Sequence, residues 1–189
     1  MKKWFISSAL TLGLLASLPL AASANSYTIV KGDTLWSIGE RYSVSVLDLQ
    51  KTNDIEGSLI YPGQVLTLPT AVSAEERDLL SRLVHAEAKG EPYEGKVAVA
   101  TVVLNRVNSS QFPNTIKEVI NQSNAFTPVQ NGSINKPADQ EAKKAVDEAI
   151  TFGGQGNGSL FFYNPDTATS DWIFSREVIT KIGNHNFAK

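Results

Sequence analysis

The 189-residue sequence contains no cysteine, so disulfide bonds cannot contribute to its stability. It contains only two histidines, which leaves few nitrogen ligands for a metal such as zinc. Beyond residue 24 it has no apolar run long enough to cross a bilayer. We therefore expect a chain that hydrophobic cores alone hold together, with no membrane span in that part.

The first 24 residues have the features of an export signal. Lys2 and Lys3 form a positively charged start, residues 5–20 are mostly apolar, and the sequence ASA at residues 22–24 fits the small-x-small cleavage rule. A transmembrane anchor is the alternative, but serines and a threonine interrupt the apolar run, and a good cleavage site follows it. We predict that residues 1–24 are removed and that the mature chain is secreted, with no membrane attachment.

The mature chain also lacks an excess of basic residues. Without Lys2 and Lys3, the 17 basic residues fall to 15 against 19 acidic ones, a net charge of −4. Nucleic-acid binding depends on a basic surface, so this balance gives it no support. The remaining 165 residues are enough for one medium-sized domain or two small ones.

Residues 26–69 are predicted to form a small βααβ module. The β-prone run YTIV begins it, and residues 64–69 alternate like a closing strand. Between them, residues 35–42 and 46–52 have helical spacing, and Asp33 or Thr34 can cap the first helix. A module of about this length is close to the lower size limit of an independent domain.

The same segment resembles a LysM domain along its whole length. The shared marks are the opening VKGDTLWSIG, the asparagine after the second helix and the ending IYPGQVLTLP. The resemblance implies binding of glycans that contain N-acetylglucosamine, mainly peptidoglycan and chitin. It also implies a groove between two loops, formed by Gly32, Asp33, Thr34, Leu35, Ile60, Tyr61, Pro62 and Gly63. For Leu35, packing in the small core is the favoured alternative.

Residues 70–73 form a short linker, and residues 74–189 are predicted to form a second module of the α+β class. Apolar periodicity predicts helices over residues 73–89, 93–108, 115–121 and 137–152. Residues 97–104 are apolar nearly all round, which is typical of a buried central helix. After a glycine-rich loop, short β segments are predicted at residues 160–163, 172–174 and 178–179. We expect the two modules to shift against each other on their short tether.

Glu87 is the strongest catalytic candidate. With Leu80, Leu83 and Val84 it occupies positions i, i+3, i+4 and i+7 of one helical stripe. Burial of an ionised carboxylate is costly, so the pKa of Glu87 should rise and let it donate a proton near neutral pH. The alternative is that Glu87 lies at the rim of the stripe and pairs with a basic neighbour or with solvent.

The second module resembles the SleB/CwlJ-type cell wall hydrolases, which include spore-cortex-lytic enzymes. The matching segments are LLSRLVHAEAKGEPYEGKVAVATVVLNRV, FPNTIKEVI, AFTPVQNG, SLFFYNP and KIGNHNF. The resemblance implies a mainly helical, lysozyme- or transglycosylase-like domain with a small sheet. It also implies cleavage of the peptidoglycan glycan strand between N-acetylmuramic acid and N-acetylglucosamine, in the cell wall or the spore cortex. The catalytic glutamate of the family falls on Glu87.

No second acidic residue stands in an apolar setting comparable to that of Glu87. Glu91 is expected in the loop at the helix end, and Asp166 and Asp171 lie in polar turns. Hydrolysis of a glycosidic bond usually needs a second carboxylate as nucleophile or base. A single acid suits a lytic transglycosylase, in which the C6 hydroxyl of the sugar closes an anhydro ring and Glu87 changes from acid to base. We favour this reaction over hydrolysis.

Further aromatic and polar residues are candidates to line the glycan groove, since aromatic faces stack on sugar rings and amides bind hydroxyl groups. They are Phe126, Gln130, Tyr163, Asn164, Trp172 and Arg176, of which Tyr163, before the Asn-Pro turn, is the best candidate. For Phe126, a place in the core is the favoured alternative.

Two other functions stay open. An N-acetylmuramoyl-L-alanine amidase would typically need three ligands around zinc, but His85 and Glu87 point in different directions on a helix, and His185 is the only other histidine. A non-catalytic peptidoglycan-binding protein is the second alternative, although no part of the family segments is obviously missing. We expect peptidoglycan as the partner, no cofactor or bound metal, and a monomer.

Overall fold

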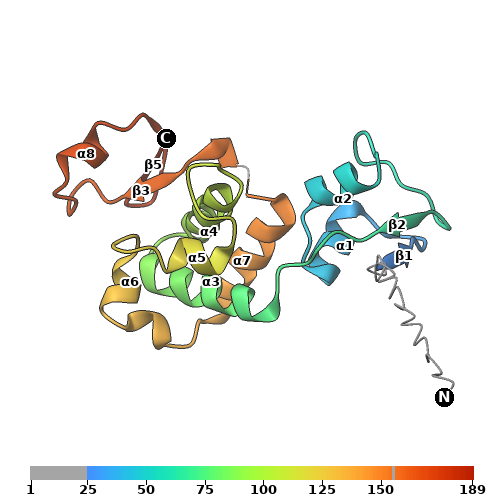
Figure 1. Ribbon diagram of the computed structural model, residues 1–189, viewed down its shortest axis with the longest axis horizontal. Helices are drawn as coiled ribbons and strands as arrows, with labels where there is room; N and C mark the ends of the chain where they lie inside the picture. The colour runs from blue at the N-terminus through green and yellow to red at the C-terminus, as the bar shows by residue number, and fades with distance from the viewer. Residues whose placement is uncertain (1–24, 155) are drawn as a thin grey trace, which may run out of the picture.

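The computed structural model describes residues 25–154 and 156–189. It contains an N-terminal module and a larger second module, which lie side by side (Figure 1). The predicted export signal, residues 1–24, lies outside the described residues. Within the described part of the chain, none of the helices is both long and apolar enough to span a membrane.

The N-terminal module has the predicted βααβ order. It consists of β1 (Ser26–Thr28), α1 (Leu35–Tyr42), α2 (Val46–Thr52) and β2 (Val65–Thr67). The two strands pair antiparallel, with Ser26 opposite Thr67. The core of the module consists of six side chains that are each at most 3% exposed: Ile29, Leu35, Ile38, Val44, Leu49 and Leu66. A core this small makes the module dependent on well-formed turns.

Polar side chains fix the turns of this module. Thr34 is the N-cap of α1, since its hydroxyl oxygen accepts from the Ser37 N–H while the Ser37 hydroxyl oxygen accepts from the Thr34 N–H. After α2, the Asn53 amide accepts from the Thr67 N–H and donates to the carbonyls of Leu49 and Thr67. Asn53 thereby joins α2 to β2, which explains the asparagine at the end of the second helix.

The second module is α+β, as predicted. Its helices are α3 (Ala74–Glu87), α4 (Tyr93–Val107), α5 (Ile116–Ile120), α6 (Thr127–Gln130), η1 (Ser133–Asn135), α7 (Gln140–Phe152), η2 (Gly156–Gly158) and α8 (Asp171–Phe174). Its strands are β3 (Phe161–Tyr163), β4 (Val178–Ile182) and β5 (His185–Ala188), which form an antiparallel sheet in the order β3-β5-β4. The sheet and α8 lie on the side of the helices away from the N-terminal module (Figure 1).

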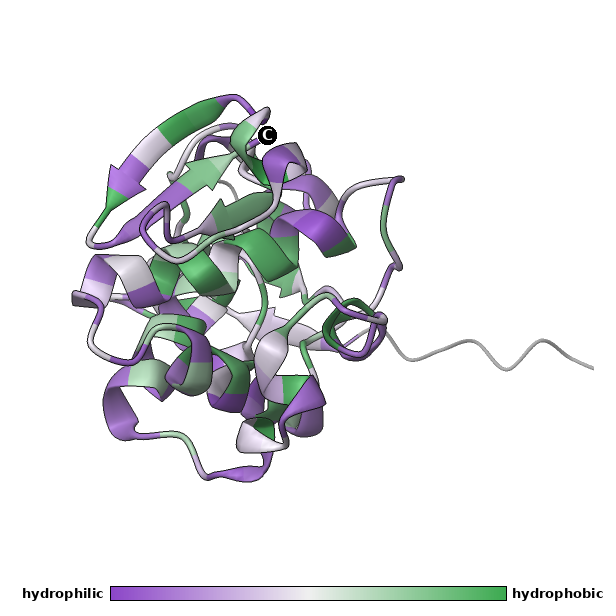
Figure 2. Ribbon diagram, turned by 90° about the vertical axis from the view of Figure 1, so that its left-hand side faces the viewer, coloured by the Kyte–Doolittle hydropathy of each residue, from purple (hydrophilic) through white to green (hydrophobic). Residues whose placement is uncertain are grey.

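Helix α4 is the buried central helix that the sequence predicted. It packs against α7, α3 and α5, and Val99, Val102 and Val103 on it are fully buried. Figure 2 shows hydrophobic residues concentrated on the inner helices and hydrophilic residues on the outer surfaces. Two charged residues of α4, Lys96 and Arg106, are also buried. Buried charges need partners, so each of the two indicates a specific local arrangement.

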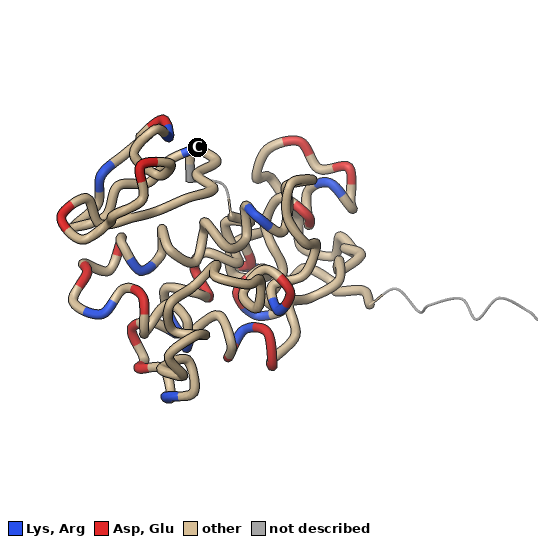
Figure 3. The backbone as a smooth tube through the Cα atoms, turned by 60° about the vertical axis from the view of Figure 1, so that its left-hand side comes forward, with Lys and Arg blue, Asp and Glu red and all other residues tan. Residues whose placement is uncertain are grey.

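Charged residues of both signs are interspersed over the two modules (Figure 3). Several of them join neighbouring helices of the second module. Arg77 of α3 pairs with Asp147 of α7, and the buried Lys96 of α4 pairs with Glu141 of α7 at 2.6 Å. These ion pairs therefore reinforce the packing of α7 on α3 and α4.

Two predictions for the C-terminal part are wrong. Residues 172–174 belong to the short helix α8 and not to a strand, and residues 185–188 form the strand β5, which was not predicted. A short apolar run does not distinguish a helical turn from a strand, so its neighbours in space decide. Strand β5 lies between β3 and β4, and its Phe187 is only 1% exposed, so pairing on both sides and burial produce it.

The two modules pack against each other, whereas the sequence suggested that they would shift on their tether. The Trp36 ring of α1 meets the Phe152 ring of α7 edge-on, with ring centroids 4.7 Å apart. The linker is also held, because the Val72 N–H donates to the Ser43 carbonyl at 3.0 Å. Aromatic contact and linker together fix how the N-terminal module sits on α7.

We expect Trp36→Ala and Phe152→Ala to be coupled in a double-mutant cycle. Each substitution should lower the free energy of unfolding. The coupling free energy should be about 1 kcal/mol, because either single substitution already removes the edge-on aromatic contact and the second cannot remove it again. Urea denaturation of the full chain measures it. Leu59→Ala is the control partner, since Leu59 is 66% exposed, and its effect should add to that of Trp36→Ala. Additivity of Trp36→Ala and Phe152→Ala would contradict the interdomain contact.

Candidate active site

Glu87 is the last residue of α3 and completes the predicted stripe. The side chains of Leu80, Leu83 and Val84, which precede it on that stripe, are fully buried. Glu87 itself is partly buried. Within residues 25–154 and 156–189, its carboxyl group makes no hydrogen bond or ion pair. The helix thus places a carboxyl group at the edge of the core without a direct partner.

This environment changes the protonation of Glu87. Burial raises its pKa to about 7, and the positive charge of Arg106 acts in the opposite direction. At neutral pH about half of the molecules therefore hold a protonated Glu87. A carboxyl group of this kind can donate a proton and take one back at the same pH, which general acid–base catalysis requires.

Arg106 is the partner that sequence reasoning missed. It lies in the last turn of α4 and is only 8% exposed. Its Nε–H donates to the Leu160 carbonyl at 2.8 Å. Three phenylalanine rings surround its guanidinium, with centroids 5.1 to 5.6 Å from Cζ: Phe112, Phe126 and Phe161, here called the phenylalanine cage. Burial lowers the pKa of Arg106 to about 10, so it is still a cation at neutral pH.

The sequence did contain a signal for Arg106. It continues the stripe of Val99, Val102 and Val103 on α4 at the same spacing at which Glu87 continues the stripe of α3. Two charged residues, one of each sign, thus end two buried stripes of neighbouring helices. The same argument that selected Glu87 would have selected Arg106.

A pocket of about 330 Å³ opens at Arg106. Its lining includes Arg106, Phe112, Gln122, Asn124, Phe161 and Trp172, and we call it the Arg106 pocket. Trp172 is half-exposed and meets the Phe161 ring edge-on at 5.1 Å. Arg106 lines this pocket and also acts on Glu87, so we take the Arg106 pocket as the candidate substrate site. The aromatic walls and side-chain amides of the pocket suit a sugar.

The structure brings some of the predicted groove residues to this pocket. Trp172 lines it, and the Arg176 guanidinium lies over the Trp172 ring at 4.7 Å. Phe126 is 3% exposed, so it is a core residue that contributes a ring to the phenylalanine cage. Gln130, at the end of α6, is exposed and donates to the Asn124 side chain at 3.4 Å. Gln130 is thus connected to the pocket lining through Asn124.

The other two candidates lie at the end of β3. Tyr163 is partly buried, its ring meets that of Phe174 edge-on at 5.5 Å, and its hydroxyl oxygen accepts from the Asn186 amide. The Asn164 side chain accepts from the Asp166 N–H, so it shapes the turn after the strand. Neither residue lines the Arg106 pocket, and Asn164 has a structural role that its side-chain oxygen already fulfils.

The two loops predicted to form the glycan groove of the N-terminal module lie next to each other. The Gly63 N–H donates to the Ile29 carbonyl at 2.8 Å, which joins the second loop to the strand that leads into the first. Tyr61 is 61% exposed, and Pro62 and Gly63 are exposed as well. Leu35 is only 3% exposed, so it packs in the core.

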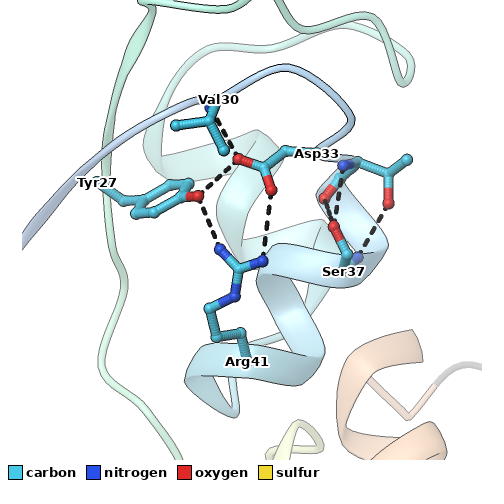
Figure 4. A network of polar contacts seen from close by, with 6 residues as sticks. Tyr27, Val30, Asp33, Ser37 and Arg41 are labelled. Carbon is cyan, nitrogen blue, oxygen red and sulfur yellow. Dashed lines mark hydrogen bonds and ion pairs between the residues drawn. The ribbon is translucent and has the colours of Figure 1, made fainter.

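Asp33 has a structural role in the first loop. Its carboxylate accepts from the Tyr27 hydroxyl at 2.6 Å, from the Val30 N–H at 2.9 Å and from Arg41 at 3.4 Å (Figure 4). The hydrogen bond from Tyr27 is the main reason why the pKa of Asp33 lies below its usual value. With these donors around it, the Asp33 carboxylate holds the loop that follows β1.

Glu91 lies in the turn between α3 and α4 and ties this turn to the sheet. Its carboxylate accepts from the Asn184 N–H and from the Asn184 side-chain amide, both at 2.9 Å. Burial works to raise the pKa of Glu91, but these two hydrogen bonds and the nearby His185 and Lys96 outweigh it, and the pKa is lowered. Glu91 is therefore an ionised carboxylate that holds the α3–α4 turn to the β4–β5 turn. Both of its oxygens are used in these hydrogen bonds.

The two histidines lie on different elements, His85 on α3 and His185 on β5, and each has its own contacts. His85 Nδ1 lies 3.1 Å from an oxygen of Asp139, the N-cap of α7. His185 is buried on β5, where its ring packs against Phe162 and Phe187. In the described part of the chain, no three His, Cys, Asp or Glu side chains are grouped so that they could hold a metal ion.

Comparison with protein families gives two matches. Residues 27–69 match the LysM domain, and residues 90–188 match the Cell Wall Hydrolase family. Both resemblances inferred from the sequence are thereby confirmed. The second match begins just after Glu87, so the role of Glu87 depends on its environment and not on that match.

Individual relatives agree with the family matches. The spore cortex-lytic enzyme of Bacillus cereus is 47% identical over 122 residues, which are 65% of this chain and 47% of that protein. The chain thus spans about half the length of the curated relatives it matches. The crystal structure of the catalytic domain of Bacillus cereus SleB is similar to this chain with a TM-score of 0.60 and 47% sequence identity. The matched region is 65% of this chain and 95% of that domain.

A second solved structure has the same extent. It is the catalytic domain of the germination-specific lytic transglycosylase SleB from Bacillus anthracis, with a TM-score of 0.61 at 46% identity. This chain covers all of that domain with 65% of its own residues. The similarity therefore extends over the whole catalytic domain of these proteins.

Replacing Glu91 tests whether its ionised carboxylate stabilises the fold. We expect Glu91→Gln to lower the free energy of unfolding at pH 7 by about 1–3 kcal/mol, because two buried hydrogen bonds to a charged group are weakened. Since the folded-state pKa of Glu91 is lowered, its contribution is complete above its unfolded pKa and disappears as the pH falls below about 4. Urea titrations across pH measure this.

The matched control is Glu94→Gln, the same change at an exposed position three residues further along. It should leave the free energy of unfolding nearly unchanged at every pH. A loss in Glu91→Gln that is equally large at pH 3 and pH 7 would show that Glu91 does not act through its ionised carboxylate.

Proposed function

Because this chain belongs to the cell wall hydrolase family, we propose that it cleaves the glycan strand of peptidoglycan between N-acetylmuramic acid and N-acetylglucosamine. The observation that carries the proposal is Glu87, a partly buried carboxyl group with a pKa of about 7, on which Arg106 acts from the lining of a pocket walled by aromatic rings. Cleavage of a glycosidic bond needs a proton donor for the leaving oxygen, and Glu87 has the protonation state for it.

We propose that the reaction is a lytic transglycosylation. Glu87 donates its proton to the glycosidic oxygen, the bond from that oxygen to C1 of the muramic acid breaks, and positive charge develops at C1. The Glu87 carboxylate then takes the proton of the C6 hydroxyl, whose oxygen bonds to C1 and closes a 1,6-anhydro ring. The proton and both bonds are balanced without water and without a second carboxylate.

The acids that were considered as a second catalytic group are occupied or exposed in the described structure, which supports this choice over hydrolysis. Glu91 is committed to Asn184, Asp166 is exposed in the turn after β3, and Asp171, which the sequence placed in a turn, is the exposed first residue of α8. A carboxylate that activates water must stand across the scissile bond from the acid, in both inverting and retaining enzymes. The similar domain from Bacillus anthracis carries the name of a lytic transglycosylase, which agrees with this reading of the site.

The N-terminal module is proposed to bind the same polymer. It matches the LysM domain, and its exposed loop at Tyr61, Pro62 and Gly63 is joined by the Gly63 N–H to the carbonyl of Ile29, which precedes the loop that Asp33 holds. Helix α3 begins near this module and runs about 20 Å away from it to Glu87 (Figure 1). A strand bound at one end is thereby kept at high local concentration near the site of cleavage.

The place of action follows from the substrate. Peptidoglycan lies outside the cytoplasm, so we propose that the mature chain is secreted, as a monomer, to the cell wall or the spore cortex. The similarity to spore cortex-lytic enzymes makes cortex peptidoglycan the first substrate to test, with vegetative cell wall as the second.

Mass spectrometry of digested peptidoglycan tests the proposal. We expect muropeptides with 1,6-anhydro-muramic ends, and no activity in Glu87→Gln, since the amide cannot transfer the proton; the loss should be at least about 100-fold. Glu75→Gln makes the same change at the exposed start of α3 and should keep the parental rate. Both cortex and vegetative sacculi serve as substrates.

Other products would each contradict a part of the proposal. Reducing muramic ends would replace transglycosylation by hydrolysis. Release of free stem peptides with intact glycan strands would indicate an amidase. Parental activity of Glu87→Gln would remove Glu87 from the reaction altogether.

A further inference from the structure

We propose that Arg176 binds a carboxylate group that the stem peptides of peptidoglycan carry. The proposal assigns an anion-binding subsite to the edge of the Arg106 pocket. It rests on the proposed function and deepens it, since it names a part of the polymer that the site recognises besides the sugar rings.

The Arg176 guanidinium has no polar partner within the protein. All five arginines lie in the described part of the chain, and the guanidinium groups of the other four donate hydrogen bonds: Arg41 to Tyr27 and Asp33, Arg77 to Asp147, Arg82 to Asp78, and Arg106 to the Leu160 carbonyl. Within residues 25–154 and 156–189, the Arg176 side chain makes no hydrogen bond or ion pair, and its Nε–H is buried without an acceptor. A cation that is partly removed from water and unpaired in its own chain indicates a partner outside the chain.

An aromatic ring holds this guanidinium at the pocket. Cζ of Arg176 lies 4.7 Å from the centre of the Trp172 ring, and Trp172 lines the Arg106 pocket. Trp172 meets Phe161 edge-on at 5.1 Å, and the Phe161 ring lies 5.6 Å from Cζ of Arg106. The two arginines are thus joined through the rings of one aromatic wall. Stacking uses the face of a guanidinium and leaves the N–H groups at its edge for an acceptor.

The charges around the pocket favour an anion. Among the described residues that line the pocket, Arg106 is the charged one, and none is a carboxylate. Positive charge without a carboxylate in the lining attracts a ligand group of negative charge. A guanidinium suits a carboxylate in particular, because two of its N–H groups can donate in parallel to the two oxygens.

The proposed substrate carries its carboxylates on its peptides. The sugar rings of peptidoglycan hold neutral hydroxyl and acetamido groups, and the lactyl group of a peptide-bearing muramic acid is bound in an amide. A carboxylate close to the glycosidic bond therefore belongs to a stem peptide. We expect Arg176 to bind it while the aromatic wall packs on the sugar, so that muramic acids with an attached peptide are preferred.

The test compares Arg176→Gln with the parental full chain on sacculi whose carboxylates are free or blocked. Carbodiimide coupling to ammonia blocks them by forming neutral amides, and release of soluble muropeptides measures kcat/KM. On untreated sacculi, Arg176→Gln should be about tenfold less efficient through a higher KM, because one charged hydrogen-bonding partner is lost. Blocking should make the parental chain about tenfold less efficient and should leave Arg176→Gln unchanged, since the contact can be removed only once.

A matched variant and a third substrate are the controls. Lys181→Gln removes an exposed cation of β4 that does not line the pocket, and it should match the parental chain on both kinds of sacculi. This control separates a local contact from general attraction to an anionic polymer. Glycan strands freed of their peptides by an amidase carry the lactyl carboxylate alone, and on them Arg176→Gln should equal the parental chain. Circular dichroism confirms the fold of each variant.

Defined results overturn the inference. If blocking slows Arg176→Gln as much as the parental chain, Arg176 does not meet the carboxylate. A tenfold loss of Arg176→Gln on peptide-free strands would rule out the stem peptide as the source of the contact. If Arg176→Gln does not fold, the parental chain decides, because equal efficiency on untreated and blocked sacculi also contradicts the inference. Parental activity of Glu87→Gln in the same assay would instead refute the proposed function, so the two failures are distinguishable.

Discussion

Glu87 and Arg106 end two buried stripes on neighbouring helices, and the balance between burial and attraction at this pair governs the site. Burial of the Glu87 carboxyl group favours its neutral form, and the cation of Arg106 favours its ionised form. The outcome is a pKa of about 7, above the ordinary value of a glutamate, because burial is the larger of the two effects. A group balanced in this way is an acid and a base at the same pH, and the proposed single-residue reaction requires both roles.

Several contacts of the second module fix the positions of Arg106 and of the end of α3, where Glu87 lies. Helix α4, the most buried helix, carries Arg106, and segments from three parts of the chain supply the phenylalanine cage. Glu91 clamps the turn that follows Glu87 to the sheet, which fixes the end of α3. The N-terminal module, which we propose binds the same polymer, lies near the start of α3, and its contact through Trp36 and Phe152 fixes its position on α7.

The sequence predicted what depends on local patterns. The βααβ module, the buried α4 and the stripe that ends in Glu87 all follow from periodicity within one segment. Arg106 was missed although its stripe was visible, because its significance comes from Phe112, Phe126 and Phe161, which only the folded chain brings together. For the same reason the strand β5 and the contact of Trp36 with Phe152 were not foreseen: each needs a partner distant in the sequence.

The most direct test of the account is the titration of Glu87 itself by carbon-13 NMR of the glutamate side-chain carboxyl groups in the parental chain. The spectrum of Glu87→Gln identifies the signal, because that signal is absent from it. The account predicts a titration midpoint of about 7 for Glu87. A midpoint near 4.5, the ordinary value for a glutamate, would mean that Glu87 is solvated and ionised at neutral pH, and would contradict its role as the proton donor.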